Sequence, residues 1–221
     1  MQHCPSPNHD ERPLGAVIDM LVIHYTGMAS AKEAIERLCN PHANVSAHYV
    51  VHEDGRIVQL VEEERRAWHA GVAFWRGNTD INARSIGIEM VNPGHEFGLR
   101  PFTEKQMITL EMLALDILKR HPVPGRNVVG HSDVAPRRKL DPGEFFDWFR
   151  LYKSGIGIWP KIIKGKKMNK RQASMLLQEF GYEIDDLVKT LEAFQRHFRP
   201  TKIDGGLDIE TMQLINGLEK K

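Results

Sequence analysis

The chain has 221 residues, which is long enough for one or two domains with a sizeable buried core. Its 30 basic and 29 acidic side chains leave a formal net charge of +1, so no strong field favours nucleic acid. No apolar run approaches the ~20 residues that span a bilayer. We therefore expect a globular protein with no nucleic-acid partner and no membrane span.

The N-terminal region alternates between strand-like and helix-like patterns. The strand-like runs are rich in β-branched residues, and the helix-like runs repeat apolar residues at helical spacing after a capping residue. In chain order we expect a strand at 16–27, a helix beginning at Ser30, a hairpin around 53–55, a strand at 85–92, a helix at 103–121 and a strand at 127–131. Strands interleaved with helices predict an α/β fold with one central sheet.

The last sixty residues have a different pattern. The basic stretch IGIWPKIIKGKKMN, residues 156–169, carries glycines and a proline and is typical of a linker or strap. Three short helical patterns follow, beginning at Asn169, Asp185 and Asp208. We therefore divide the chain into a domain at 1–160 and a small three-helix domain at 161–221. A bundle this small buries little alone, so we expect it to dock on the first domain.

Three polar side chains in the N-terminal region have the chemistry of metal ligands. His24 and His131 each end a predicted strand, and Asp141 lies in the proline-braced segment GHSDVAPRRKLDPG, residues 130–143. A catalytic zinc ion takes three such ligands and keeps a fourth position for water. Alternatively, the histidines are buried strand-end residues and Asp141 caps a following helix. Spacing alone leaves both interpretations open.

Five segments resemble, in order, the zinc-dependent type 2 N-acetylmuramoyl-L-alanine amidases. They are LVIHYTG, VSAHYVV, RAWHAG, SIGIEMVN and GHSDVAPRRKLDPG, and the resemblance covers about residues 16–159. It implies a mixed central β-sheet flanked by helices and one Zn²⁺ per chain, held by His24, His131 and Asp141. It also implies hydrolysis of the amide between N-acetylmuramic acid, or its 1,6-anhydro form, and the L-alanine of the peptidoglycan stem peptide. Such enzymes act in cell-wall turnover or recycling.

The same resemblance implies roles for four further residues. Glu89 matches the family's catalytic glutamate, which passes a proton toward the leaving nitrogen. Lys139 matches a lysine that faces the developing oxyanion. Trp68 and His69 match positions that line the substrate groove. Trp68 could stack on a sugar, and His69 could equally be a hydrogen-bonded residue behind the ligands.

The other histidines show no pattern of a site. We expect His48, which alternates with Tyr49 along a strand, to be structural. We expect the remaining ones to lie on the surface: His3, His9, His42, His52, His95, His121 and His197.

The C-terminal region has a resemblance of its own. LEAFQRHFRPTKIDGGLDIETMQLINGL, residues 191–218, resembles the three-helix peptidoglycan-binding module, over about 168–219. This implies peptidoglycan or muropeptide fragments as partners, whereas the alternative is a plain helical appendage that stabilises the sheet. For the whole chain, the alternative function is a non-catalytic peptidoglycan-recognition protein on the same fold, a class that commonly loses a metal ligand.

The start of the chain bears on location. MQHCPSPNHDERP lacks the apolar core of a secretory signal, so we expect a cytoplasmic protein for the chain as it stands. If its natural start is missing, we expect the periplasm or the cell envelope instead.

Overall fold

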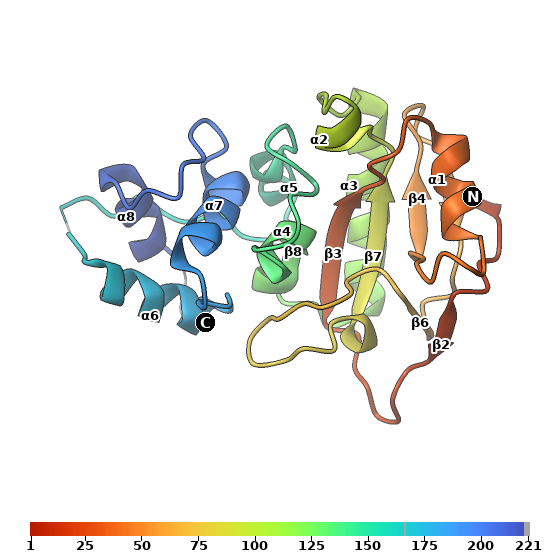
Figure 1. The fold of residues 1–221 in the computed structure, drawn as a ribbon, viewed down its shortest axis with the longest axis horizontal. Helices are drawn as coiled ribbons and strands as arrows, with labels where there is room; N and C mark the ends of the chain where they lie inside the picture. Colours follow the sequence, from red (N-terminus) through yellow and green to blue (C-terminus); the bar gives the residue numbers. More distant parts are fainter. Residues whose placement is uncertain (166, 219–221) are drawn as a thin grey trace.

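A computed structural model describes residues 1–165 and 167–218, and a six-stranded mixed sheet lies at its centre (Figure 1). The strand order is β1-β5-β4-β7-β3-β8, where the strands span Gln2–His3 (β1), Met20–Tyr25 (β3), Tyr49–Val51 (β4), Ile57–Gln59 (β5), Ser85–Met90 (β7) and Val128–Gly130 (β8). Only the β4–β5 hairpin in this sheet is antiparallel. The expected mixed α/β sheet is confirmed.

A second, two-stranded sheet was not predicted from the sequence. It pairs β2, His9–Glu11, with β6, Arg65–Ala67, in antiparallel register. Both strands have three residues and are charged, so neither shows the apolar alternation by which longer strands are recognised.

Two of the five helices before residue 160 begin where their capping residues predict. Their bounds are Ala31–Leu38 (α1), Gly94–Phe97 (α2), Glu104–Arg120 (α3), His131–Val134 (α4) and Trp148–Lys153 (α5), with 3-10 turns at Asn82–Arg84 (η1) and Gly125–Asn127 (η2). Ser30 caps α1, and Thr103 and Gln106 form a capping box at the start of α3. Helix α5 is capped by Asp147. The alternative in which Asp141 caps the following helix is therefore wrong.

The two faces of the sheet bury different partners. Leu21 and Ile23 of β3 belong to the apolar cluster that α3 completes. Met20 and Val22 alternate with them and face the opposite side, as the two-residue period of a strand requires. His24 follows on that same opposite side, away from α3.

The three C-terminal helices pack on the β8 side of the sheet (Figure 1). They span Lys170–Phe180 (α6), Leu187–Phe198 (α7) and Ile209–Asn216 (α8). Asn169 and Asp208 cap α6 and α8 as predicted, whereas Asp186 rather than Asp185 caps α7. Their apolar side chains share one buried cluster with Met20 and Val22.

Among residues 1–165 and 167–218, no helix has both the length and the apolar character that crossing a membrane requires.

Candidate active site

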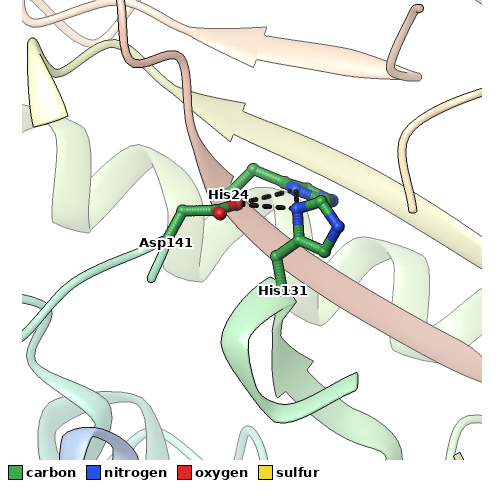
Figure 2. A group of neighbouring side chains, drawn as sticks. All are labelled: His24, His131 and Asp141. Carbon is green, nitrogen blue, oxygen red and sulfur yellow. Dashed lines mark hydrogen bonds and ion pairs between the residues drawn. The ribbon is translucent and has the colours of Figure 1, made fainter. Parts of the chain in front are cut away.

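The three predicted metal ligands converge in one buried cluster (Figure 2). His24 Nδ1, His131 Nδ1 and Asp141 Oδ2 lie 3.0 Å apart in every pair. The three residues are at most 5% exposed. In a tetrahedral zinc site with bonds near 2.0 Å, ligand atoms lie roughly 3.3 Å apart. The cluster therefore has the dimensions of a site for one such ion.

Three separate segments place these ligands. His24 is near the carboxyl end of β3, and His131 opens α4 directly after the neighbouring parallel strand β8. The expectation that His131 ends a strand is thus off by one residue. The backbone N–H of Ser132 donates to the carbonyl of Asp141 at 2.9 Å, which fixes the Asp141 loop against α4.

A chain of hydrogen bonds sets the tautomer of His24. The Ser85 hydroxyl donates to the Ile81 carbonyl at 2.6 Å, so Ser85 Oγ accepts from His69 Nε2 at 3.0 Å. His69 Nδ1 is then free to accept from His24 Nε2 at 3.0 Å. The lone pair of His24 is consequently on Nδ1, which faces the ligand cluster.

One contact sets the tautomer of His131. Its Nε2 lies 2.9 Å from the Ala70 carbonyl, which can only accept, so in the neutral imidazole Nδ1 carries the lone pair. Two histidine lone pairs and the Asp141 carboxylate therefore face one another with no proton between them. Three acceptors directed at one point fit a bound cation, and this is the observation that supports a metal here.

The electrostatics of the cluster agree with this arrangement. Burial, with a further contribution from nearby His131, lowers the pKa of His24 to about 4, so its imidazole is neutral near pH 7. Burial alone would raise the pKa of Asp141, but His131 and His24 outweigh it and hold that pKa well below its usual range. A neutral His24 and an ionised Asp141 are the protonation states that metal ligation needs.

Glu89 lies next to the cluster because of strand register. It is the Cα partner of His24 in the parallel β3–β7 pair, so both side chains project from the same face of the sheet. Its Oε2 atom is buried and has no hydrogen-bond partner among the described residues. Burial, reinforced by the negative Asp141, raises the pKa of Glu89 well above its usual range.

All seven residues singled out in the sequence line one cleft of about 640 Å³. Lys139 and Trp68 are both partly exposed there, whereas His69 is buried behind His24. Gly87 makes room for His69, since a Cβ at that position would lie 2.5 Å from the imidazole. The structure thus supports the interpretation of His69 as a hydrogen-bonded residue behind a ligand.

The cleft also contains residues that the sequence did not single out. The Tyr25 hydroxyl lies 2.9 Å from His95 Nδ1, and His95 Nε2 lies 2.9 Å from Glu144. Tyr25 could have been found because it directly follows His24 on β3. His95 lies in the four-residue helix α2 and Glu144 in a turn, and neither segment is long enough to show a pattern in the sequence.

The burial of the other histidines agrees only in part with the expectation from the sequence. His48 is fully buried and accepts the Gly87 N–H, so its predicted structural role is confirmed. His52 and His197 are buried, so their assignment to the surface was wrong. His197 is buried in the contact with the rest of the protein, where it hydrogen-bonds to Asp133, 64 residues earlier in the chain.

The comparisons with known proteins agree with this site. Residues 14–144 match the family model described as N-acetylmuramoyl-L-alanine amidase. Over 232 aligned residues the chain is 37% identical to the N-acetylmuramoyl-L-alanine amidase AmiD of Escherichia coli (strain K12), covering 92% of this chain and 83% of the relative. It is 34% identical to the 1,6-anhydro-N-acetylmuramyl-L-alanine amidase AmpD of Enterobacter cloacae, covering 68% of this chain and 88% of that relative.

Solved structures extend the similarity to the C-terminal helices. The E. coli AmiD complex with anhydro-N-acetylmuramic acid-L-Ala-D-γ-Glu-L-Lys superposes with a TM-score of 0.84 at 35% identity, over 94% of this chain and 91% of that one. The AmpDh3 complex of Pseudomonas aeruginosa with anhydromuramic pentapeptide gives a TM-score of 0.85 at 33% identity, over 93% and 92%. The similarity therefore includes the residues beyond 144.

Proposed function

The chain belongs to the N-acetylmuramoyl-L-alanine amidase family, and from this premise we propose its substrate, its metal and the roles of its residues. The substrate is a muropeptide whose N-acetylmuramic acid is in the 1,6-anhydro form, and the bond cleaved joins the lactyl group of that sugar to L-alanine. Two relatives that match more than 90% of this chain were solved with anhydromuramyl peptides, which supports this choice. The product chemistry is that of cell-wall recycling.

The proposed metal is one Zn²⁺ per chain, held by His24, His131 and Asp141. The observation that carries this proposal is the convergence of the Nδ1 atoms of two histidines and one carboxylate oxygen on a single point. Nitrogen and oxygen donors in a three-residue set are typical of catalytic zinc. Zinc bound at such a site acts as a Lewis acid toward water and the amide carbonyl.

We propose that side chains of the protein transfer the proton and stabilise the developing charge. Glu89 is the proposed proton carrier, since its unpartnered Oε2 beside His24 can take a proton from the attacking water and deliver it to the amide nitrogen. Lys139 lines the cleft two residues before Asp141, and we propose that its ammonium group lies against the carbonyl oxygen as charge develops there. Trp68 is proposed to contact the sugar.

The alternative of a non-catalytic recognition protein is not favoured. Such a protein needs the groove but neither a complete ligand set nor a proton carrier. Here the three ligands, Glu89 and Lys139 all line the same cleft.

For the C-terminal region, we propose a peptidoglycan-binding role for a domain at 161–221 that accompanies the catalytic domain at 1–160. Support comes from its three helices α6, α7 and α8, which occur in the order that the module's sequence pattern predicts. The family model ends at residue 144 and does not cover this region.

The test is direct product analysis. Purified protein loaded with zinc is incubated with anhydro-N-acetylmuramyl tripeptide and, in parallel, with its non-anhydro counterpart, and the products are identified by mass spectrometry. We expect release of the intact tripeptide and the free anhydro sugar. Cleavage at a different bond, or no cleavage of the anhydro substrate, would contradict the proposal.

A further inference from the structure

A buried carboxylate links the metal-site helix α4 to the C-terminal helices. Asp133 is 1% exposed and lies two residues after the ligand His131. Its Oδ1 accepts the hydroxyl of Tyr182 at 2.7 Å, and its Oδ2 lies 2.7 Å from His197 Nδ1. Tyr182 and His197 both belong to the C-terminal region.

Both partners are packed against aromatic rings, two of which belong to the N-terminal part of the chain. Tyr182 is fully buried, and its ring packs edge-on against Trp75 with centroids 5.0 Å apart. The His197 imidazole lies between the rings of Trp148 and Phe198, with centroid distances of 3.9 and 4.0 Å and nearly parallel planes. The donors therefore have fixed positions, and they fix the carboxylate that they bind.

Asp133 in turn organises the segment that carries the ligands. Its Oδ2 also accepts the backbone N–H of Gly130 at 2.7 Å, at the point where β8 turns into α4. Helix α4 has only four residues, too few to be stable without tertiary contacts. Its Ser132 N–H holds the carbonyl of Asp141, so the position of α4 sets both His131 and Asp141.

From these contacts we infer that Tyr182 and His197 are positioning residues for the metal site, acting through Asp133 on His131 and Asp141. The C-terminal helices thus complete the metal site, in addition to any contact they make with peptidoglycan. The inference rests on the proposed zinc site. This positioning role differs from stabilisation of the sheet, because it depends on two hydrogen bonds to Asp133 and not on packing alone.

The test uses variants that remove the hydrogen bond and the ring packing of His197 separately. His197→Phe keeps a flat ring between Trp148 and Phe198 but removes the donor, whereas His197→Asn keeps an amide donor near the place of Nδ1 and loses the ring. Tyr182→Phe removes one hydroxyl and keeps the ring. Leu214→Ala is the matched control, because Leu214 is buried in the C-terminal cluster without being bonded to Asp133.

The readouts are zinc affinity, by competition with a chromophoric chelator, and the melting temperature of the zinc-free protein. We expect Tyr182→Phe and His197→Phe to weaken zinc binding about tenfold, the low end of the effect of removing a group that orients a ligand. His197→Asn should bind zinc more tightly than His197→Phe. Leu214→Ala should lower the melting temperature with little change in affinity.

The outcomes separate the possible failures. Wild-type zinc affinity in both Tyr182→Phe and His197→Phe would overturn the inference, and so would affinity that follows melting temperature across all four variants. If the wild-type protein binds no zinc, the proposed function itself fails.

Discussion

At the scale of single residues, Glu89 and Lys139 border the ligand cluster without belonging to it. The cluster has three ligand atoms at mutual distances of 3.0 Å, and neither residue supplies one of them. Loss of either side chain should therefore leave metal binding intact and impair the chemical step.

Glu89→Gln is the sharper of the two substitutions because it keeps the shape of the side chain. We expect it to retain one zinc per chain and to lower kcat by ~10²–10⁴, the usual contribution of a general acid–base group, with a smaller change in KM.

Lys139→Met should retain zinc and lose ~10²–10³ in kcat, as for one oxyanion donor. Steady-state kinetics with elemental analysis on each variant checks both. A near-normal kcat in zinc-loaded Glu89→Gln would place the proton carrier elsewhere.

The residues of the candidate site were predictable where a short motif carried them. His24, His131, Asp141, Glu89 and Lys139 all lie in such motifs, and all face one cleft. Asp133 is in the same segment as His131, yet its partners are 49 and 64 residues away in sequence. Nothing local in the sequence indicates that pairing, because it arises only when the C-terminal helices dock.

At the scale of elements, one buried carboxylate ties α3 to the β4–β5 hairpin. Glu63 follows β5 and is 7% exposed. It accepts the Tyr49 hydroxyl of β4 at 2.7 Å, and it pairs with Arg120 at 2.8 Å and with His121 at 2.6 Å, at the end of α3. Burial alone would raise the pKa of Glu63, but these partners lower it to about 2.

This depressed pKa predicts a specific pH dependence. The unfolded chain protonates Glu63 near the ordinary glutamate pKa of 4.5, and the folded protein does so only near 2. The contribution of Glu63 to stability is therefore present above about pH 4.5 and is lost as the pH falls toward 2. The shift corresponds to at most about 3 kcal/mol. Urea unfolding should show Glu63→Gln clearly less stable than wild type at pH 7, with the difference shrinking at pH 3. The exposed neighbour variant Glu64→Gln should show neither effect. A deficit of equal size at both pH values would assign it to packing.

The elements themselves were predictable to different degrees. Helices α1, α3, α6 and α8 begin at their expected caps, because a capping side chain and an apolar stripe are local signals. The one-turn helix α4 and the short strands β1, β2 and β6 are too short to show a period. Their conformation is set by neighbours that are distant in sequence.

At the scale of the whole molecule, the C-terminal helices share a hydrophobic core with the sheet that carries the candidate site. Met20, Val22 and Val129 of the central sheet share a buried cluster with Phe180 and Phe194 of the C-terminal helices. Removing residues 161–221 would expose the sheet side of that cluster, so truncation is a poor way to separate wall binding from catalysis. The point variants at Tyr182 and His197 leave the cluster in place and are better suited.

The central claim is that His24, His131 and Asp141 hold the zinc ion on which amide hydrolysis depends. The most direct test is to titrate zinc-free protein with Zn²⁺ while following tripeptide release from anhydro-N-acetylmuramyl tripeptide. We predict activity that rises linearly and stops at one zinc per chain, and no such rise in His131→Ala at the same zinc concentrations. Full activity in the zinc-free protein, or an identical titration in His131→Ala, would contradict the account.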